Sequence, residues 1–391
     1  MGGGLMQLVA YGAQDIYLTG NPQITFFKVV YRRHTNFSME AIEQTWNGSD
    51  TTSGRCTATI SRNGDLVHRM YLEISGTVNA NTDNLSSMIT DVELEIGGQK
   101  IDKQSGKWME VWAELTEPNT SGLVAVHAAP QVKGTPFQRM SGMGGLHNGA
   151  GTVTNSFIPL QFWFCRNPGL ALPLIALQYH EVKIILNHLI SDTLDAGAGR
   201  VNKLWADYIY LDTDERRRFA QVSHEYLIEQ VQEQSLAAAQ TTNDLNFNHP
   251  VKELIWARGS AAGDGRTTTS LLLPFNAIGD KAHIKLNGHD RFAPRDSRYF
   301  TRTQVWQHHT GGGGLDSATA EGIGKSNDSI AVYSFALKPE EHQPSGTCNF
   351  SRIDNAQLIT SGAIPAETHI YAVNYNVLRI MSGMGGLAYS N

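Results

Sequence analysis

Short segments in which apolar and polar residues alternate with a period of two recur along this chain. In one of them, Met70, Leu72 and Ile74 are separated by Tyr71 and Glu73. Similar segments lie at 92–96, 182–186 and 284–286. Because successive side chains of a strand point to opposite faces, each segment predicts a strand with one face in a core. The chain is therefore expected to be all-β, with short helices near 106–115 and 212–219.

Short segments of the first half recur in the same order in the second half. The pairs are 37–44 with 226–233, 70–76 with 253–259, 94–98 with 284–288, 110–112 with 304–306, and 162–164 with 333–335. All five offsets lie between about 170 and 195 residues, as expected for a duplicated unit whose loops differ in length. We therefore predict an N-terminal arm over 1–24 and two similar β domains over 25–212 and 213–391. The periodicity indicates a β-sandwich but does not by itself select the jelly roll.

The charge of the chain argues against a role in coating nucleic acid. The formal net charge is −6, whereas proteins that neutralise DNA phosphates carry clustered positive charge. Charged residues make up 17% of the chain, below the roughly 25% of an average soluble domain. This composition favours a protein that hides much of its surface in contacts with other proteins.

The residues that usually carry catalysis or bind metals form no recognisable motif. The three cysteines, Cys56, Cys165 and Cys348, have no metal-ligand spacing, and their odd number favours a reducing compartment. The pair His308-His309 is interpreted as a polar loop edge, and Glu340-Glu341 as a solvated turn. No catalytic residue, cofactor or metal is predicted. The segment 140–146 recurs as 381–387, outside the duplication series, and is interpreted as a flexible turn rather than a nucleotide site.

Three longer segments carry a resemblance to a known family. They are YGAQDIYLTGNPQITFFKVVYRRHTNF from Tyr11 to Phe37, PSGTCNFSRIDNAQL from Pro344 to Leu358, and NYNVLRIMSGMGGL from Asn374 to Leu387. Together they resemble the double jelly-roll major capsid proteins of nucleocytoplasmic large DNA viruses. The segment Leu211–Phe219 is also similar, so the resemblance extends over most of the chain.

The resemblance implies a fold and a structural function. The fold would be two consecutive eight-stranded antiparallel jelly-roll β-sandwiches, with short helices in their connections and an extended N-terminal arm. Three chains would form a homotrimer, a pseudo-hexameric capsomer that tiles an icosahedral virus shell. The implied partners are neighbouring capsomers, minor capsid and penton proteins, and inner membrane-associated proteins, without direct contact to nucleic acid. The protein would reside in the virion, be assembled in the host cytoplasm and have no enzymatic activity.

Two sets of residues are the candidate functional residues. Apolar residues of the arm are expected to contact neighbouring subunits during assembly: Leu5, Leu8, Val9, Tyr11, Ile16 and Tyr17. Residues of the second resembling segment are expected to have a structural role: Pro344, Gly346, Cys348, Asn349, Phe350, Arg352 and Asp354. The alternative is a β-sandwich protein that binds or cleaves glycans, which would need aromatic residues and paired carboxylates on a concave face.

Overall fold

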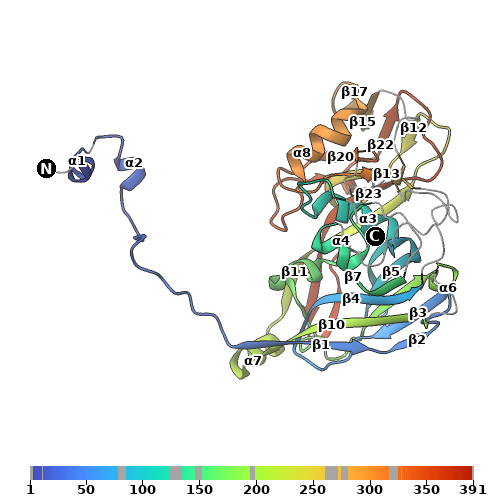
Figure 1. Ribbon diagram of the computed structural model, residues 1–391, viewed down its shortest axis with the longest axis horizontal. Coiled ribbons are helices and arrows are strands. Elements are labelled where there is room, and N and C mark those ends of the chain that lie inside the picture. Colours follow the sequence, from blue (N-terminus) through green and yellow to red (C-terminus); the bar gives the residue numbers. More distant parts are fainter. Residues whose placement is uncertain are drawn as a thin grey trace. The chain divides into compact units, whose positions relative to one another are not determined.

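The structure is a computed structural model of the full chain, and two units make it up (Figure 1). It describes residues 3–10, 12–77, 85–123, 134–145, 152–193, 199–259, 272–273, 281–316, 325–326 and 328–389. The N-terminal unit, Met1–Asn36, contains the short helices α1 (Gly3–Val9) and α2 (Ile16–Thr19), followed by extended chain. The second unit, Phe37–Asn391, contains all the strands found among the described residues. No helix among the described residues is long and apolar enough to cross a membrane.

The first half of the second unit is a sandwich of two antiparallel sheets. One sheet has the order β1 (Phe37–Gln44), β10 (Val201–Leu211), β4 (Leu66–Thr77), β7 (Thr152–Pro159), with β8 (Leu172–Pro173) beside β4. The other has the order β2 (Trp46–Gly48), β3 (Gly54–Thr59), β9 (Val182–His188), β5 (Ile89–Ile96), β6 (Gln99–Ser105). Leu72 and Ile74 of β4 pack with Val92 and Leu94 of β5 in the core between the sheets. The alternating segments therefore form strands as predicted.

The second half repeats this arrangement. One sheet has the order β11 (His224–Ser235), β23 (Thr368–Met381), β13 (Pro250–Gly259), β14 (Leu272–Leu273), with β20 (Ile330–Ser334) and β21 (Cys348–Asn349) beside β13 and β24 (Met384–Leu387) beside β23. The other has the order β12 (Thr242–Asp244), β22 (Ala356–Thr360), β15 (Lys281–Leu286), β16 (His289–Asp290), with β17 (Arg295–Asp296) beside β15. A small hairpin pairs β18 (Leu315–Asp316) with β19 (Lys325–Ser326). Leu254, Trp256, Ile284 and Phe300 are central residues of the second core.

Eight strands of each sandwich follow the same order in their two sheets. The order β1, β10, β4, β7 matches β11, β23, β13, β20, and β3, β9, β5, β6 matches β12, β22, β15, β16. The repeated sequence segments lie on corresponding elements: β1 and β11, β4 and β13, the ends of β5 and β15, a helix that precedes β7 or β20, and the chain at or just after β7 and β20. The structure therefore confirms the duplication.

Short helices lie in the connections between strands, and one of them, α3, packs against both sandwiches. In the first sandwich these are η1 (Leu85–Met88), α3 (Gly106–Thr116), α4 (Pro136–Ser141), α5 (Trp163–Arg166), η2 (Pro168–Leu170) and α6 (Ile190–Thr193). Then follow α7 (Thr213–Gln221), η5 (Tyr299–Thr303), α8 (Gln304–His308) and η6 (Phe350–Arg352). Helices α3 and α7 were predicted to within about two residues. Helix α3 is capped by the Ser105 side chain and contributes Met109 to the first core.

The opposite face of α3 covers the second sandwich. Its apolar residues on this face are Trp108, Val111, Trp112 and Leu115. They pack on the outward face of the sheet that contains β11, β23, β13 and β20, against Val231, Ile255, Val332, Tyr371 and Val373. As a result β13 is buried on both faces.

Candidate assembly surfaces and the domain interface

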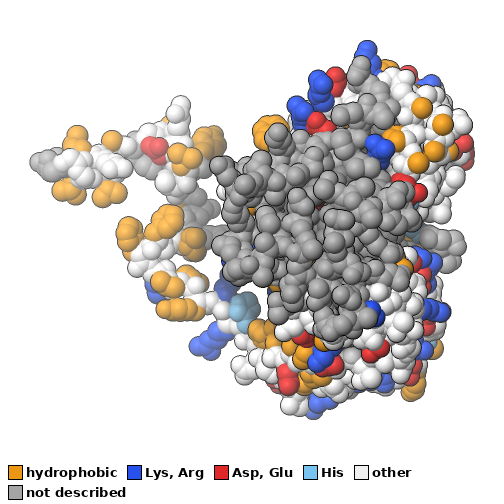
Figure 2. All heavy atoms as spheres, turned by 45° about the vertical axis from the view of Figure 1, so that its right-hand side comes forward, with side chains coloured by type: hydrophobic (Ala, Val, Ile, Leu, Met, Phe, Trp, Pro, Cys, Tyr) orange, Lys and Arg blue, Asp and Glu red, His pale blue; other side chains and the backbone are white. Residues whose placement is uncertain are grey.

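The apolar residues predicted in the arm are exposed in the N-terminal unit. Leu8 and Tyr17 are 81% and 91% exposed, and Leu5, Val9 and Ile16 are more than half exposed. Tyr11 lies outside the described residues. Figure 2 shows hydrophobic side chains spread along this unit. Side chains of this size are usually covered in a folded protein, so the unit presents an apolar surface suited to contact with another protein.

The exposed apolar stretch continues beyond the predicted arm boundary at residue 24. Phe26 and Phe27 are fully exposed, and Ile24, Val29, Val30 and Tyr31 are also more than two thirds exposed. These residues belong to the N-terminal unit, which ends at Asn36. The sequence ITFFKVVY, Ile24 to Tyr31, lies at the predicted boundary between the arm and the first domain. The candidate assembly segment is therefore longer than the sequence indicated.

The segment 344–354 lies on the second sandwich. Cys348 and Asn349 form β21 and pair with Val251 and Pro250 of β13. Phe350 is buried in the second core, and its backbone N–H donates to the His249 carbonyl oxygen. Gly346 has φ +134°, and a Cβ there would lie 2.8 Å from the Phe335 carbonyl oxygen, so this backbone requires glycine.

The other residues of that candidate set are on the surface. Pro344, Arg352 and Asp354 are exposed, and the Asp354 N–H donates to the Asn287 side chain. The segment therefore covers the edge of the second core through Phe350, while the Arg352 side chain is exposed to solvent.

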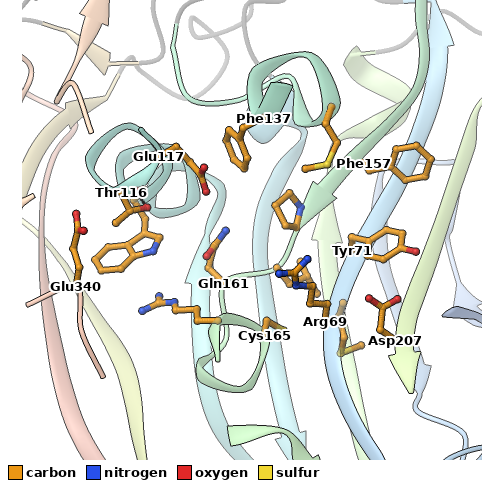
Figure 3. Close-up of a pocket in the computed structure, with 16 residues that line it drawn as sticks. Arg69, Tyr71, Thr116, Glu117, Phe137, Phe157, Gln161, Cys165, Asp207 and Glu340 are labelled. Atoms are coloured by element: carbon orange, nitrogen blue, oxygen red, sulfur yellow. Dashed lines mark hydrogen bonds between the residues drawn. The ribbon is translucent and has the colours of Figure 1, made fainter. Parts of the chain in front are cut away.

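A pocket of about 710 Å³ opens on the outward face of the first sandwich (Figure 3). Arg69 and Tyr71 of β4, Phe157 of β7 and Asp207 of β10 form one side. The other side comes from α3, α4, α5 and the second sandwich: Trp112, Thr116, Glu117, Phe137, Met140, Cys165, Arg166 and Glu340. Burial raises the pKa of the Cys165 thiol to about 12, so the thiol is protonated and unsuited to act as a nucleophile.

A buried ionic cluster connects the two sandwiches. The Glu229 carboxylate accepts from Lys252 Nζ at 2.7 Å and from Arg166 Nη1 at 3.0 Å, and His342 Nδ1 lies 3.5 Å away. Lys252 is 1% exposed and also donates to the Pro339 carbonyl oxygen at 2.6 Å. Burial by itself would raise the pKa of Glu229, but His342, Lys252 and Arg166 outweigh it and lower that pKa to about 2. Arg166 comes from the first sandwich, so the cluster holds the domains together.

A second buried cluster surrounds His309. Its Nε2 lies 2.9 Å from Glu253 Oε2 and its Nδ1 lies 3.0 Å from Glu340 Oε1. Burial lowers the pKa of this histidine, but the two carboxylates overcome that effect and raise it to about 9. The predictions of a polar loop edge at His309 and of a solvated turn at Glu340 were therefore wrong. Only Glu341, which pairs with Lys338 on the surface, behaves as the turn prediction implied.

The contacts found in the described part of the chain are structural in kind. No group of three or more His, Cys, Asp or Glu there is placed to hold a metal ion. Some deeply buried charged residues form ion pairs that connect one strand or one domain to another, and buried Glu110 and Asp102 accept hydrogen bonds from backbone N–H groups. The exposed apolar side chains concentrate in the N-terminal unit.

Comparison with protein families gives matches over both sandwiches. Residues 25–212 match the model described as "Major capsid protein N-terminus". Residues 215–386 match the model described as "Large eukaryotic DNA virus major capsid protein". Together the two models span almost all of the second unit.

Individual proteins are similar over the full chain. The major capsid protein of Pyramimonas orientalis virus is 54% identical, and that of Paramecium bursaria Chlorella virus 1 is 42% identical, each over 100% of both chains. The chain also aligns with a quasi-atomic model of the PBCV-1 virus capsid, with a TM-score of 0.75 and 37% identity over 94% of this chain and 100% of that one. The Faustovirus major capsid protein shares the fold, with a TM-score of 0.63 at 14% identity.

Proposed function

Because the chain belongs to the family of large eukaryotic DNA virus major capsid proteins, we propose that three copies of it form a pseudo-hexameric capsomer that tiles an icosahedral shell. The observation that carries this proposal is the pair of jelly-roll sandwiches with the same strand order in one chain. Three such chains supply six similar sandwiches, which is the number needed for a ring with pseudo-sixfold symmetry. Most soluble oligomers are made of identical subunits with a closed point-group symmetry, and a threefold ring is one such arrangement.

The finer details of the role are part of the same proposal. The capsomer contacts its neighbours in the virion, and minor capsid, penton and inner membrane-associated proteins bind at its edges and base. Assembly takes place in the host cytoplasm. The chain has no catalytic role and no direct contact with nucleic acid, in keeping with its net charge of −6. The domains are an arm at 1–24 and two jelly rolls at 25–212 and 213–391, and the exposed apolar residues from Phe26 to Tyr31 extend the assembly segment into the start of the first range.

The mass of the purified protein in solution tests the capsomer proposal. Size exclusion with light scattering is expected to give a stable species of three times the chain mass of 42.9 kDa. Large permanent interfaces bury about 2,000–5,000 Å² or more, so the species should persist on dilution. A monomer at all accessible concentrations would contradict the proposal.

Deletion of residues 2–21 is expected to leave the capsomer intact and to impair its assembly into shells. The described residues of this segment have no buried side chain, so the two sandwiches lose nothing from their cores. Negative-stain imaging of assembled particles measures the effect, and light scattering confirms the capsomer. A full-length control with Leu5, Leu8 and Ile16 replaced by serine separates loss of apolar contact from loss of length. Normal shells from the deleted chain would remove this segment from the assembly mechanism.

A further inference from the structure

The contact between the two sandwiches of one chain uses two kinds of surface. The first is helix α3, which follows β6 and contributes Trp108 and Trp112. The second is the outward face of the sheet that contains β11, β23, β13 and β20, where Ile255 and Tyr371 lie opposite each other on β13 and β23. The Trp108 and Tyr371 rings have centroids 5.2 Å apart. Because the chain is duplicated, each kind of surface occurs twice.

The second copy of the helix surface is exposed. The sequence duplication pairs Trp112 with Trp306 of α8, and Trp306 is 81% exposed whereas Trp112 is 4% exposed. Continued by two residues beyond the matched segments 162–164 and 333–335, the same offset places Leu337 at the position of Arg166. Arg166 lies 4.3 Å above the Trp112 ring inside the domain interface, whereas Leu337 is 77% exposed. His308, two residues after Trp306, contacts the Leu337 carbonyl oxygen, so the backbone at Leu337 lies beside the end of α8.

The second copy of the sheet surface is exposed as well. On the outward face of the first sandwich, Trp205 lies opposite Tyr71 on β10 and β4, as Tyr371 lies opposite Ile255 on β23 and β13. Tyr71 packs edge-on against Phe157, and all three aromatic residues are partly exposed. The pocket of Figure 3 opens at this position and is lined by Tyr71 and Phe157. Its far wall contains Trp112 and Arg166 of the interface within the chain, so the two surfaces are continuous.

We propose that the contact inside the chain is repeated between copies: α8 of one copy docks on the outward face of β1, β10, β4 and β7 of the next, with Trp306 in the pocket beside Tyr71. The partner is a second copy of this chain, because each chain carries both surfaces of the contact: the exposed α8 surface and the exposed outward face of the first sandwich. Such a contact joins two different surfaces and generates a ring when the rotation closes. That the ring closes at three copies rests on the proposed function.

The physical case for Trp306 as the anchor is its exposure and its chemistry. An indole exposed to this degree leaves a large apolar area in water, and tryptophan is enriched among the residues that dominate interface affinity. The pocket offers aromatic walls together with Arg69, whose guanidinium can stack on an indole ring. An 81% exposed side chain contributes little to the fold, so its replacement affects association before it affects stability.

Replacement of Trp306 tests the inference on the full-length chain. Trp306→Glu is expected to weaken association by about thirtyfold or more, so that light scattering reports the monomer mass of 42.9 kDa at concentrations where the unmodified chain is trimeric. Circular dichroism and the unfolding midpoint of the isolated monomer report that the fold is kept. The matched control is Tyr179→Glu, another aromatic residue that is 75% exposed, and it should remain trimeric. A trimeric Trp306→Glu chain would overturn the inference and leave the proposed function standing.

Mixing two variants distinguishes this interface from a symmetric one. Tyr71→Glu damages the pocket and leaves Trp306 intact, whereas Trp306→Glu does the reverse, so each variant alone should be monomeric. A mixture should give a heterodimer of twice 42.9 kDa and nothing larger, because one intact interface forms and the remaining surfaces are both damaged. A mixture that stays monomeric would overturn the inference. A monomeric unmodified chain would instead contradict the proposed function itself.

Discussion

Substitution of Glu229 by glutamine is expected to lower the free energy of unfolding by about 3–5 kcal/mol at pH 7, the usual cost of removing one partner of a buried ion pair. The carboxylate lies against Lys252 and Arg166, and Lys252 is 1% exposed. Glutamine keeps the shape and an acceptor oxygen but not the charge, which leaves the Lys252 ammonium buried beside neutral acceptors, with no carboxylate in contact. The measurement is urea unfolding at a fixed protein concentration, because association also stabilises the chain.

The matched control for this substitution lies on the same strand. Glu225 pairs with Arg379 at 2.7 Å, but both side chains are more than half exposed. Glu225→Gln is therefore expected to cost less than about 1 kcal/mol of unfolding free energy.

The dependence of the unfolding free energy on acidic pH is a second test of Glu229. The pKa of Glu229 is lowered to about 2, so its contribution is present above the ordinary glutamate value of 4.5 and is lost as the pH falls towards 2. Equal losses for the two substitutions would show that the buried cluster does not stabilise the domain interface.

The strands that could be predicted from the sequence are those with one buried face. In β4 and β5 the alternation is visible because a core covers one face while the other is partly exposed. The alternation is absent from β13, which is buried on both faces by the second core and by α3. A pattern search cannot detect a strand by alternation when tertiary packing covers its second face.

Because β13 is buried on both faces, the sequence alignment of β4 with β13 was wrong by one residue. The predicted match of 70–76 with 253–259 places Leu72 on Ile255. In the structure Leu72 lies in the first core, whereas Ile255 points away from the second core and contacts the α3 cluster. Since strand side chains have a period of two, a shift of one residue reverses the faces. The duplication was found correctly, but its register needed the structure.

The ionic clusters were missed for a different reason. Glu229, Lys252 and His342 are far apart in the sequence and meet within the second sandwich, and Arg166 joins them because the two sandwiches pack together. The two copies of the repeated segment MSGMGGL adopt different backbone structures, because their tertiary surroundings differ. Its second copy contains the hairpin turn between β23 and β24, with Ser382 and Gly383 at positive φ. In its first copy the α4 helix ends and the Gly144 and Gly145 N–H groups donate to the Glu110 carboxylate, while Leu146 lies outside the described residues.

His309 is expected to make the stability of the fold depend on pH in the alkaline range. The pKa of this histidine is raised to about 9 in the folded chain, against about 6.5 in an unfolded one. A raised pKa means that the folded state binds the proton more tightly. The stabilisation is therefore complete below pH 6.5 and is lost as the pH rises through 9, with a total of up to about 3 kcal/mol.

The variant that isolates this effect is His309→Gln, compared with the unmodified chain in urea unfolding between pH 6 and 10. The difference in unfolding free energy should be largest at pH 6 and shrink towards pH 10, because the unmodified histidine becomes neutral as it loses its proton beside Glu253 and Glu340. His308→Gln is the control, since the His308 ring contacts the Leu337 carbonyl oxygen rather than a carboxylate. Glu253→Gln should flatten the dependence more than Glu340→Gln, because the Glu253 side chain is fully buried and that of Glu340 is 21% exposed. A constant difference across this range would mean that His309 is neutral in the fold and that the buried cluster is held together by hydrogen bonds alone.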